Sequence, residues 1–439
     1  MSERVSRSEG VVYAIDYGTS NSLLGYVTKD RVFDPIPLDE EAEDPTVFRS
    51  VLYFPHQDMC FYGQKAVTEY AQNYGEGRLI RSVKKYLPST RFVGSYIEDR
   101  VVRLEDLIGL FLLEMRKRAN ERLDLDVTSV VLGRPAKFSF DPTEDKMAEY
   151  RLKKAAEFAG FKHVEFLAEP IAAAFDMKKT LTEVKNVLVV DLGGGTSDFT
   201  VIRIGPDEFR QEDLLALGGV SIAGDLIDGR FVEEEVSPYF GANVRYRYPG
   251  SNNILKMPPV LKDCLCSPAD IVQMRKGDHY EFFRQIRHMA LSEEDQRHLN
   301  NLMVLSEDQL GFELYESVDR CKRGLSDSTA SEFSFVYPEV DVMFTEGRSR
   351  FNQVIDAKIQ QITDCLEETM KQSGLKSEDI DLVYCTGGTS KLFCIQEHLK
   401  SQFGEEKVVA SGFFHSVVSG LCQYAQGLIE SGGTSSWGQ

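Results

Sequence analysis

The chain has 439 residues, of which 42% are hydrophobic and 27% are charged, and its formal net charge is −19. This length exceeds what one small core can organise, so two or more domains are expected, and the acidic field disfavours nucleic acid and anionic membranes as partners. No apolar stretch reaches membrane-spanning length and the N-terminus has no apolar signal core, so we expect a cytoplasmic protein.

The eight cysteines and seven histidines show no spacing that is typical of a metal site. Cys264 and Cys266 form a close pair, but no second pair follows at the distance that a zinc module requires. The expected state of the cysteines is therefore free thiols in a reducing compartment.

The first predicted element is a strand over Val11–Ile15 that ends at Asp16 and is followed, after a turn, by a second strand over Leu23–Val27. Further along the chain, the pattern predicts a helix over Leu104–Leu123 and a strand over Val127–Leu132. The turn of the first hairpin contains three small residues: Gly18, Thr19 and Ser20.

Residues 186–205 repeat this design with a stronger turn. A β-branched strand over Val187–Val190 ends at Asp191, three glycines follow, and Asp198 precedes a strand over Phe199–Ile204. Glycines without a Cβ let backbone N–H groups crowd around phosphate oxygens, and paired carboxylates suit the magnesium ion that accompanies them. The alternative is a tight hairpin whose aspartates only cap turns.

Asp16 and Asp191 lie 175 positions apart, and this self-similarity predicts two related lobes that share one cleft. We assign residues 1–186 to the first lobe and 187–428 to the second. The least familiar part, about 236–311, is interpreted as a remodelled outer subdomain, and 429–439 as a disordered tail.

The segments AIDYGTSNS and VVDLGGGTSDF resemble the two phosphate motifs of the actin-like ATPase superfamily, and most closely those of the DnaK-type heat-shock chaperones. The resemblance implies an α/β fold of two duplicated ribonuclease H-like lobes around a nucleotide cleft, with ATP or ADP and Mg²⁺ as cofactors. The length resembles that of truncated YegD-type members of the family, which implies the ATPase half without a peptide-binding domain.

The same resemblance implies catalytic and metal-binding roles. The segments Ser82–Leu87 and Phe166–Ala174 match those that carry the family's catalytic lysine and glutamate. An ammonium near the γ-phosphate would stabilise developing charge, and Asp191 is the candidate to accept a proton from the attacking water. The implied catalytic residues are Lys84, Glu169, Asp191 and Thr196, and the implied metal-binding residues, acting through water, are Asp16, Asp191 and Asp198.

Four further stretches are implied to contact the nucleotide. One is the central turn itself, one a third glycine turn, one a helix face, and one the turn after a predicted strand over Asp381–Thr386. Lysine at 391 stands where relatives have an arginine that lies along the base, and it lacks the planar guanidinium. The implied residues are Gly193, Gly194, Gly195 and Thr196; Gly218 and Gly219; Asp319, Lys322, Arg323 and Ser326; and Gly387, Gly388, Thr389 and Lys391.

Three other positions bear on the resemblance to the DnaK-type chaperones. Pro135 matches a proline that switches between the lobes in the family, and Arg151 lies near, but offset from, the position of its partner arginine. Phe414 stands where the family has an acidic residue.

The sequence leaves three functions open. The first is a slow ATPase switch, with a protein client or co-chaperone bound through the outer lobe. The second is a nucleotide-gated interaction module with little turnover, and the third is a small-molecule, sugar-type kinase. There is no P-loop, so that route to ATP binding is excluded by pattern. The oligomeric state is not predicted.

Overall fold

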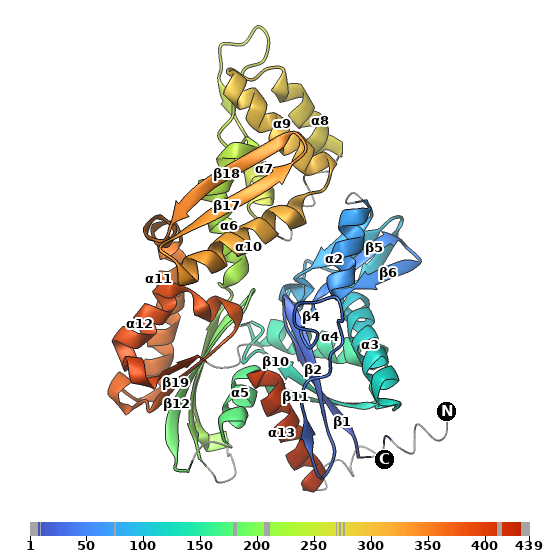
Figure 1. Cartoon of the computed structure of the whole chain (residues 1–439), viewed down its shortest axis with the longest axis vertical. Coiled ribbons are helices and arrows are strands. Elements are labelled where there is room, and N and C mark those ends of the chain that lie inside the picture. The colour runs from blue at the N-terminus through green and yellow to red at the C-terminus, as the bar shows by residue number, and fades with distance from the viewer. Residues whose placement is uncertain are drawn as a thin grey trace.

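The structure is a computed structural model that describes residues 8, 10–73, 76–139, 141–178, 182–205, 211–268, 270, 271, 274, 277–410 and 415–431. The chain forms two lobes that stand side by side and are joined at their base (Figure 1). None of the described helices combines the length and apolar character that a bilayer span requires.

Each lobe is built on one sheet. The first sheet has the order β11-β10-β1-β2-β3, with β4 also paired to β2. Strands β1, β10 and β11 are parallel, whereas β2 and β3 are antiparallel to their neighbours. The strands are β1 (Val12–Tyr17), β2 (Asn21–Val27), β3 (Val32–Phe33), β4 (Phe48–Arg49), β10 (Ser129–Arg134) and β11 (His163–Ala168).

The second sheet has the order β20-β19-β12-β13-β14 and the same sequence of two parallel and two antiparallel pairings. β12 therefore corresponds to β1, and β13 to β2, which confirms the predicted duplication and fold class. The strands are β12 (Lys185–Leu192), β13 (Ser197–Ile204), β14 (Leu214–Val220), β19 (Leu382–Thr386) and β20 (Val408–Ala410).

Two helices lie between the sheets and join the lobes (Figure 1): α5 (Glu169–Lys178) and α13 (Ser416–Glu430). One apolar cluster contains residues of β1, α5, β12 and α13, including Ala14, Ala172, Val189 and Leu421, all fully buried. Small residues on α5 let the elements approach closely, so the bases of the two lobes pack as one layer.

The other face of the first sheet is covered by α3 (Leu104–Leu123) and α4 (Pro142–Phe158). α3 has the predicted bounds. α4 begins at Pro142, because the Asp141 carboxylate accepts hydrogen bonds from the backbone N–H groups of Thr143 and Glu144 and caps the helix. The outer part of this lobe contains β5 (Val51–His56), β6 (Met59–Tyr62), α2 (Gly63–Gln72), β7 (Arg78–Arg81), the 3₁₀ turn η1 (Val83–Tyr86), β8 (Gly94–Ile97) and β9 (Arg100–Arg103).

The outer part of the second lobe is mostly helical and rests on a two-stranded ribbon, β17–β18 (Figure 1). Its core is continuous with the lower sheet through Phe231, Leu314 and Phe351. Its elements are α6 (Gly224–Phe231), the π-turn η3 (Val232–Val236), η4 (Ser237–Phe240), β15 (Arg245–Tyr246), β16 (Leu255–Lys256), α7 (Pro259–Leu265), α8 (Gly277–Arg287), α9 (Glu293–Glu307), α10 (Gly311–Asp327), β17 (Ala330–Tyr337) and β18 (Val340–Gly347).

The remaining elements return to the base of the lobe: α11 (Arg348–Ser373), the 3₁₀ turn η7 (Gly388–Lys391), α12 (Phe393–Phe403) and the short turns η2 (Gln211–Asp213), η6 (Ser377–Asp379) and η8 (Glu405–Lys407). α11 ends at Gly374, which has a φ of 73° and caps the helix. The predicted tail, 429–439, begins inside α13, and residues 432–439 lie outside the described residues.

Candidate functional site: the cleft between two glycine turns

The turns of the two corresponding hairpins face each other across the lobes. A Cβ atom placed on Gly194 would lie 2.7 Å from Ser20 Oγ, and one placed on Gly195 would lie 3.2 Å from Thr19 Oγ1. The first distance is shorter than real Cβ contacts, so a side chain at position 194 would displace the Ser20 hydroxyl, and glycine lets the two turns approach closely without such a shift. Both predicted phosphate turns therefore belong to one site.

Asp16 and Asp191 occupy equivalent positions near the ends of β1 and β12, and the structure brings them together. Both are partly buried, and burial raises the pKa of Asp191 to about 6, with the Glu169 carboxylate as a further cause. Burial first, and then the charges of Glu169 and Asp191, raise the pKa of Asp16 well above its usual value. The structure therefore places the two aspartates near each other and not on distant surfaces.

Asp198 lies opposite Asp191 in the β12–β13 register and is 2% exposed. Burial raises its pKa well above the usual value, as does the Asp191 charge, while a hydrogen bond from the Thr196 side chain opposes the shift. Thr196 is therefore placed beside the carboxylate cluster, and its carbonyl accepts a 3.0 Å hydrogen bond from the N–H of Gly193 that closes the turn.

Lys84 is the cation at the centre of this cluster. Its ammonium donates a 2.7 Å hydrogen bond to Glu169 Oε1, and the two residues are 8% and 7% exposed. Burial lowers the pKa of Lys84, but the carboxylates of Glu169 and Asp16 outweigh it and raise the pKa above the usual value. Lys84 is therefore held as a charged group.

Lys84 is directed by the backbone around it. Ser82 has a φ of 55°, a left-handed conformation that turns the chain between β7 and η1. The Arg151 guanidinium donates to the carbonyls of Leu87 at 3.0 Å and Ser89 at 2.8 Å, and so holds the segment that follows. The sequence comparison left the role of Arg151 open; the structure ties it to the lysine segment from α4.

The charge of the cluster suits a cation. Four carboxylates, those of Asp16, Glu169, Asp191 and Asp198, surround one ammonium, and burying unpaired charge is costly. Oxygen donors are also the ligands that Mg²⁺ prefers. In the described part of the chain, no three His, Cys, Asp or Glu side chains are arranged to ligate a metal directly, and contact through water, as predicted from the sequence, does not require such a group.

The turn after β19 completes the floor of the cleft. Thr386 Oγ1 donates a 2.8 Å hydrogen bond to Asp191 Oδ1, and Thr389 Oγ1 donates one of 2.7 Å to the carbonyl of Gly193. Gly387 has a φ of 77° and packs against the backbone of Leu192. Of the predicted residues, Thr389 therefore contacts the central turn and Gly387 packs just before it, and Thr386 is a contributor that the sequence analysis missed.

The third glycine turn is placed differently from the prediction. Gly218 and Gly219 lie within β14, where a Cβ on Gly218 would overlap Thr369 of α11 and one on Gly219 would lie 2.8 Å from Asp198 Oδ1. Gly218 thus packs against a helix rather than reaching the turns. This corrects the assignment of Gly218, while Gly219 borders the cluster through Asp198.

The segment that does reach the central turn begins six residues after Gly218. The N–H of Gly224 donates to the Gly193 carbonyl at 3.2 Å, and that of Asp225 donates to the Gly194 carbonyl at 2.7 Å. A Cβ on Gly224 would lie 2.8 Å from Thr389 Oγ1. The sequence signal that could have found this contact is the Gly-Asp pair that opens α6.

The residues predicted to contact the nucleotide from one helix face lie on α10, and Lys322 among them already forms an ion pair within the protein. Lys322 donates a 2.7 Å hydrogen bond to Asp228 of α6 and lies 3.2 Å from Asp319, which also pairs with Arg323 at 3.1 Å. Burial raises the pKa of Asp228 to about 6 even with this partner. The sequence analysis named Asp319, Lys322 and Arg323 and missed Asp228, which no motif marks.

Ser326 lies at the end of the same face. The Arg348 guanidinium donates to the carbonyls of Leu325 at 2.8 Å and Ser326 at 3.3 Å, and its other face lies 4.1 Å from the centroid of the Phe393 ring. Lys391, just before this phenylalanine, is exposed. Phe414 lies outside the described residues.

Comparison with known proteins agrees with this geometry. The model of the family described as "Hsp70 protein" matches residues 83–213 and 286–412, which is more than half of the chain. A chaperone protein DnaK from Thermosipho melanesiensis is 23% identical over 415 residues, covering 92% of this chain and 56% of the relative.

The DnaK proteins of Thermosipho africanus and Thermotoga neapolitana are also 23% identical, with coverages of 90% of this chain and 55% and 56% of theirs. The chain thus spans about half the length of the curated relatives it matches. On the family match and the shared fold, the chain belongs to the Hsp70 family, a family of nucleotide-binding, chaperone-type ATPases with an actin-like fold.

Proposed function

We propose that this chain binds ATP with Mg²⁺ between its two glycine turns and hydrolyses it slowly, as a chaperone-like switch. The observation that carries the proposal is the buried cluster in which Lys84 and Glu169 lie beside Asp16 and Asp191. Such a site pairs a fixed cation with carboxylates that are poised to hold a hydrated metal and to move a proton.

In this proposal the backbone N–H groups of the two turns, Gly18–Ser20 and 193–196, hold the phosphates from opposite sides. Asp16, Asp191 and Asp198 hold the hydrated metal ion, which when bound would neutralise phosphate charge. Lys84, Glu169 and Thr196 position the attacking water, and Asp191, whose pKa burial raises to about 6, accepts its proton.

For the adenosine, we propose contacts from the α10 face and from the turn after β19. Asp319 and Ser326 are placed to accept or donate hydrogen bonds, while Lys322 acts through Asp228, its partner in the structure. Arg323, whose side chain is 68% exposed, would leave its ion pair with Asp319 to lie over a bound base. In the turn after β19, the residues that would contact the adenosine are Gly387, Gly388, Thr389 and Lys391.

The finer assignments also remain proposals. They are a first lobe of 1–186 and a second lobe of 187–428, a cytoplasmic location, and a protein client or co-chaperone bound by the outer subdomain, about 236–311. The family model leaves residues 214–285 unmatched, and this stretch includes residues 236–285 of the outer subdomain, which supports a role specific to this chain.

Phosphate release under single-turnover conditions tests the proposal. We expect Lys84→Ala and Asp191→Asn to lose about 10²-fold or more in rate, because each removes a group that acts on the transferred phosphoryl or the water. Lys29→Ala and Asp30→Asn, on the exposed turn after β2, are matched controls and should keep the wild-type rate. Equal rates in all five proteins would defeat the assignment.

A second function, a nucleotide-gated module with little turnover, is supported by the Lys84–Glu169 hydrogen bond, which engages this ammonium with a carboxylate of the protein itself. Calorimetry with Mg²⁺ and ATP, combined with the phosphate assay on the same sample, separates the two. Tight binding without phosphate release would favour the module, whereas release that Lys84→Ala abolishes would favour the ATPase.

A further inference from the structure

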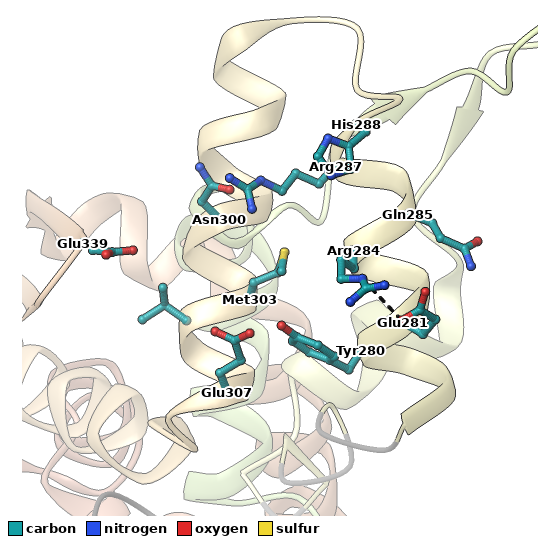
Figure 2. A pocket seen from close by; sticks show the side chains of 11 residues that line it. Tyr280, Glu281, Arg284, Gln285, Arg287, His288, Asn300, Met303, Glu307 and Glu339 are labelled. Atoms are coloured by element: carbon teal, nitrogen blue, oxygen red, sulfur yellow. Dashed lines mark ion pairs between the residues drawn. The ribbon is translucent and has the colours of Figure 1, made fainter.

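A groove on the outer part of the second lobe lies away from the interlobe cleft, between α8, α9 and the β17–β18 turn (Figure 2). Its volume is about 670 Å³, within the range of pockets that hold small ligands or short segments of chain. Part of one wall, up to Gln285, belongs to the stretch that the family model does not match. The groove is therefore a candidate for a property specific to this chain.

The two helices run in opposite directions along the groove, and this separates its charges. In Figure 2, Arg287 lies beside Asn300 at one end, and Tyr280 lies beside Glu307 at the other. Glu339, on the β17–β18 turn, adds a second carboxylate on the far side. One end is thus basic and the other is acidic.

These charges are not neutralised within the part of the chain that the structure describes. Arg284 pairs with Glu281 at 3.5 Å, but Arg287, Glu307 and Glu339 form no ion pair with a described residue. Burial raises the pKa of Glu307, and the charges of Asp308 and Glu339 raise it further. The acidic end therefore holds like charges that a cation from a ligand would relieve.

The middle of the groove is apolar and short. The Met303 side chain is buried and forms the floor together with Val304, and the Tyr280 ring lies beside them. Tyr280 and Arg287 are two turns apart on α8, which corresponds to about 10 Å of helix. An extended chain covers that distance with about three residues.

We propose that this groove binds a short peptide segment of a partner protein in which an acidic and a basic side chain stand on either side of one apolar residue. In an extended segment these two charged side chains lie on the same face. The acidic one meets Arg287, the basic one lies between Glu307 and Glu339, and the backbone between them covers Met303. A phosphate or nucleotide would leave the acidic end uncompensated, and a uniformly basic segment would place a cation against Arg287. The inference does not depend on ATP binding or hydrolysis.

The test uses three fluorescein-labelled peptides and the full chain, with binding followed by fluorescence anisotropy at an ionic strength of about 0.05 M, where exposed charges are little screened. The first peptide has the core Asp-Leu-Lys, the second Lys-Leu-Lys and the third Asp-Leu-Asp, each flanked by glycine and serine. We expect the first to bind tightest. Equal binding of the first two would mean that the acidic surface attracts any cation, and would overturn the proposal.

Charge reversal gives the sharper result. Arg287→Glu should shift the preference towards Lys-Leu-Lys, and Glu307→Lys towards Asp-Leu-Asp, each by about fivefold, the effect of one exposed ion pair of about 1 kcal/mol. The matched controls Arg297→Glu and Glu294→Lys make the same charge changes at exposed positions of α9 that do not line the groove. Controls that shift the preference as much as the groove variants would overturn the proposal.

Nucleotide affinity provides an independent readout. All four variants should keep the wild-type affinity for ATP, because the groove shares no residue with the cleft. If the expected peptide preferences are not seen while nucleotide binding is intact, this inference alone is refuted. Loss of nucleotide binding in the Lys84 and Asp191 variants bears on the proposed function alone.

Discussion

Lys84 donates a 2.7 Å hydrogen bond to Glu169, and this buried contact joins the η1 segment to the first turn of α5. Breaking a buried pair by removing one partner leaves an unpaired charge, at a cost of about 3–5 kcal/mol, whereas removing both partners costs less. A change to either residue of this pair should therefore affect both the stability of the fold and the proposed hydrolysis of ATP.

The first prediction is a double-mutant cycle on that pair. Lys84→Met should destabilise the fold by about 3 kcal/mol, because four carboxylates then lack their cation, and Lys84→Met combined with Glu169→Gln should lose less than the sum of the single changes. Urea unfolding midpoints measure both effects. Additive losses would show that the two side chains do not act as a pair.

The second prediction concerns contacts between the outer parts of the lobes. Arg49 lies 3.3 Å from Glu316, and the Tyr70 hydroxyl donates a 2.8 Å hydrogen bond to the Gln309 carbonyl. The ion pair is about one-third exposed on each side, so its loss should matter little for folding. If the cleft holds a nucleotide, Glu316→Gln should speed its release about two- to fivefold.

Stopped-flow release of a fluorescent ADP measures this change. Tyr70→Phe should act in the same direction, because it removes only the hydroxyl of the second contact. Glu332→Gln, an exposed carboxylate on β17, is the control and should leave release unchanged. Unchanged release in both contact variants would mean that the outer contacts do not hold the cleft closed.

The third prediction separates the two glycine assignments. Gly218→Ala should destabilise the fold by about 1–3 kcal/mol, since its Cβ would overlap Thr369, and the folded fraction should still bind nucleotide. Gly224→Ala places a Cβ 2.8 Å from Thr389 Oγ1, next to the central turn, and should weaken nucleotide binding more than it lowers stability. Thermal unfolding and calorimetry distinguish these outcomes, and the reverse pattern would restore Gly218 to the binding site.

The fourth prediction is a pH dependence of stability from Glu313. Burial raises the pKa of this carboxyl to about 7, and its Oε2 atom is buried without a hydrogen-bond partner among the described residues. Its pKa is raised on folding, so its stabilising contribution is complete below about pH 4.5 and is lost as the pH rises through about 7.

Glu313→Gln removes that titration and should unfold less readily than wild type at pH 8, by about 1–3 kcal/mol, with little difference at pH 5. Urea unfolding between pH 5 and 9 measures the difference. Parallel pH profiles for the two proteins would show that Glu313 does not titrate as the structure indicates.

Much of this fold could be predicted from local pattern. Short apolar runs that end at Asp16 and Asp191 predicted β1 and β12, and the runs after each turn predicted β2 and β13, because strand and turn signals act over a few residues. The bounds of α3 were also predicted. The start of α4 at Pro142 was not predicted, since the Asp141 cap was not recognised.

The site was harder to predict where contacts join distant segments. Gly218 and Gly219 carried a glycine signal, but the register of β14 against β13 turns Gly218 towards α11. Asp228 and Thr386 carried no motif at all, and their roles depend on side chains 94 and 195 positions away in the chain. Such pairings are decided by packing, which no local spacing records.

The sequence by itself determined that two similar hairpins exist, each with an aspartate at the end of its first strand, because backbone conformation there follows from nearby residue types. Only the tertiary structure decided that the hairpins meet, that Lys84 pairs with Glu169, and that Gly224 rather than Gly218 contacts the central turn. The physical reason is that α5 and α13, packed between the two sheets, fix the distance and angle between the lobes, and these follow from the shapes of many buried side chains together.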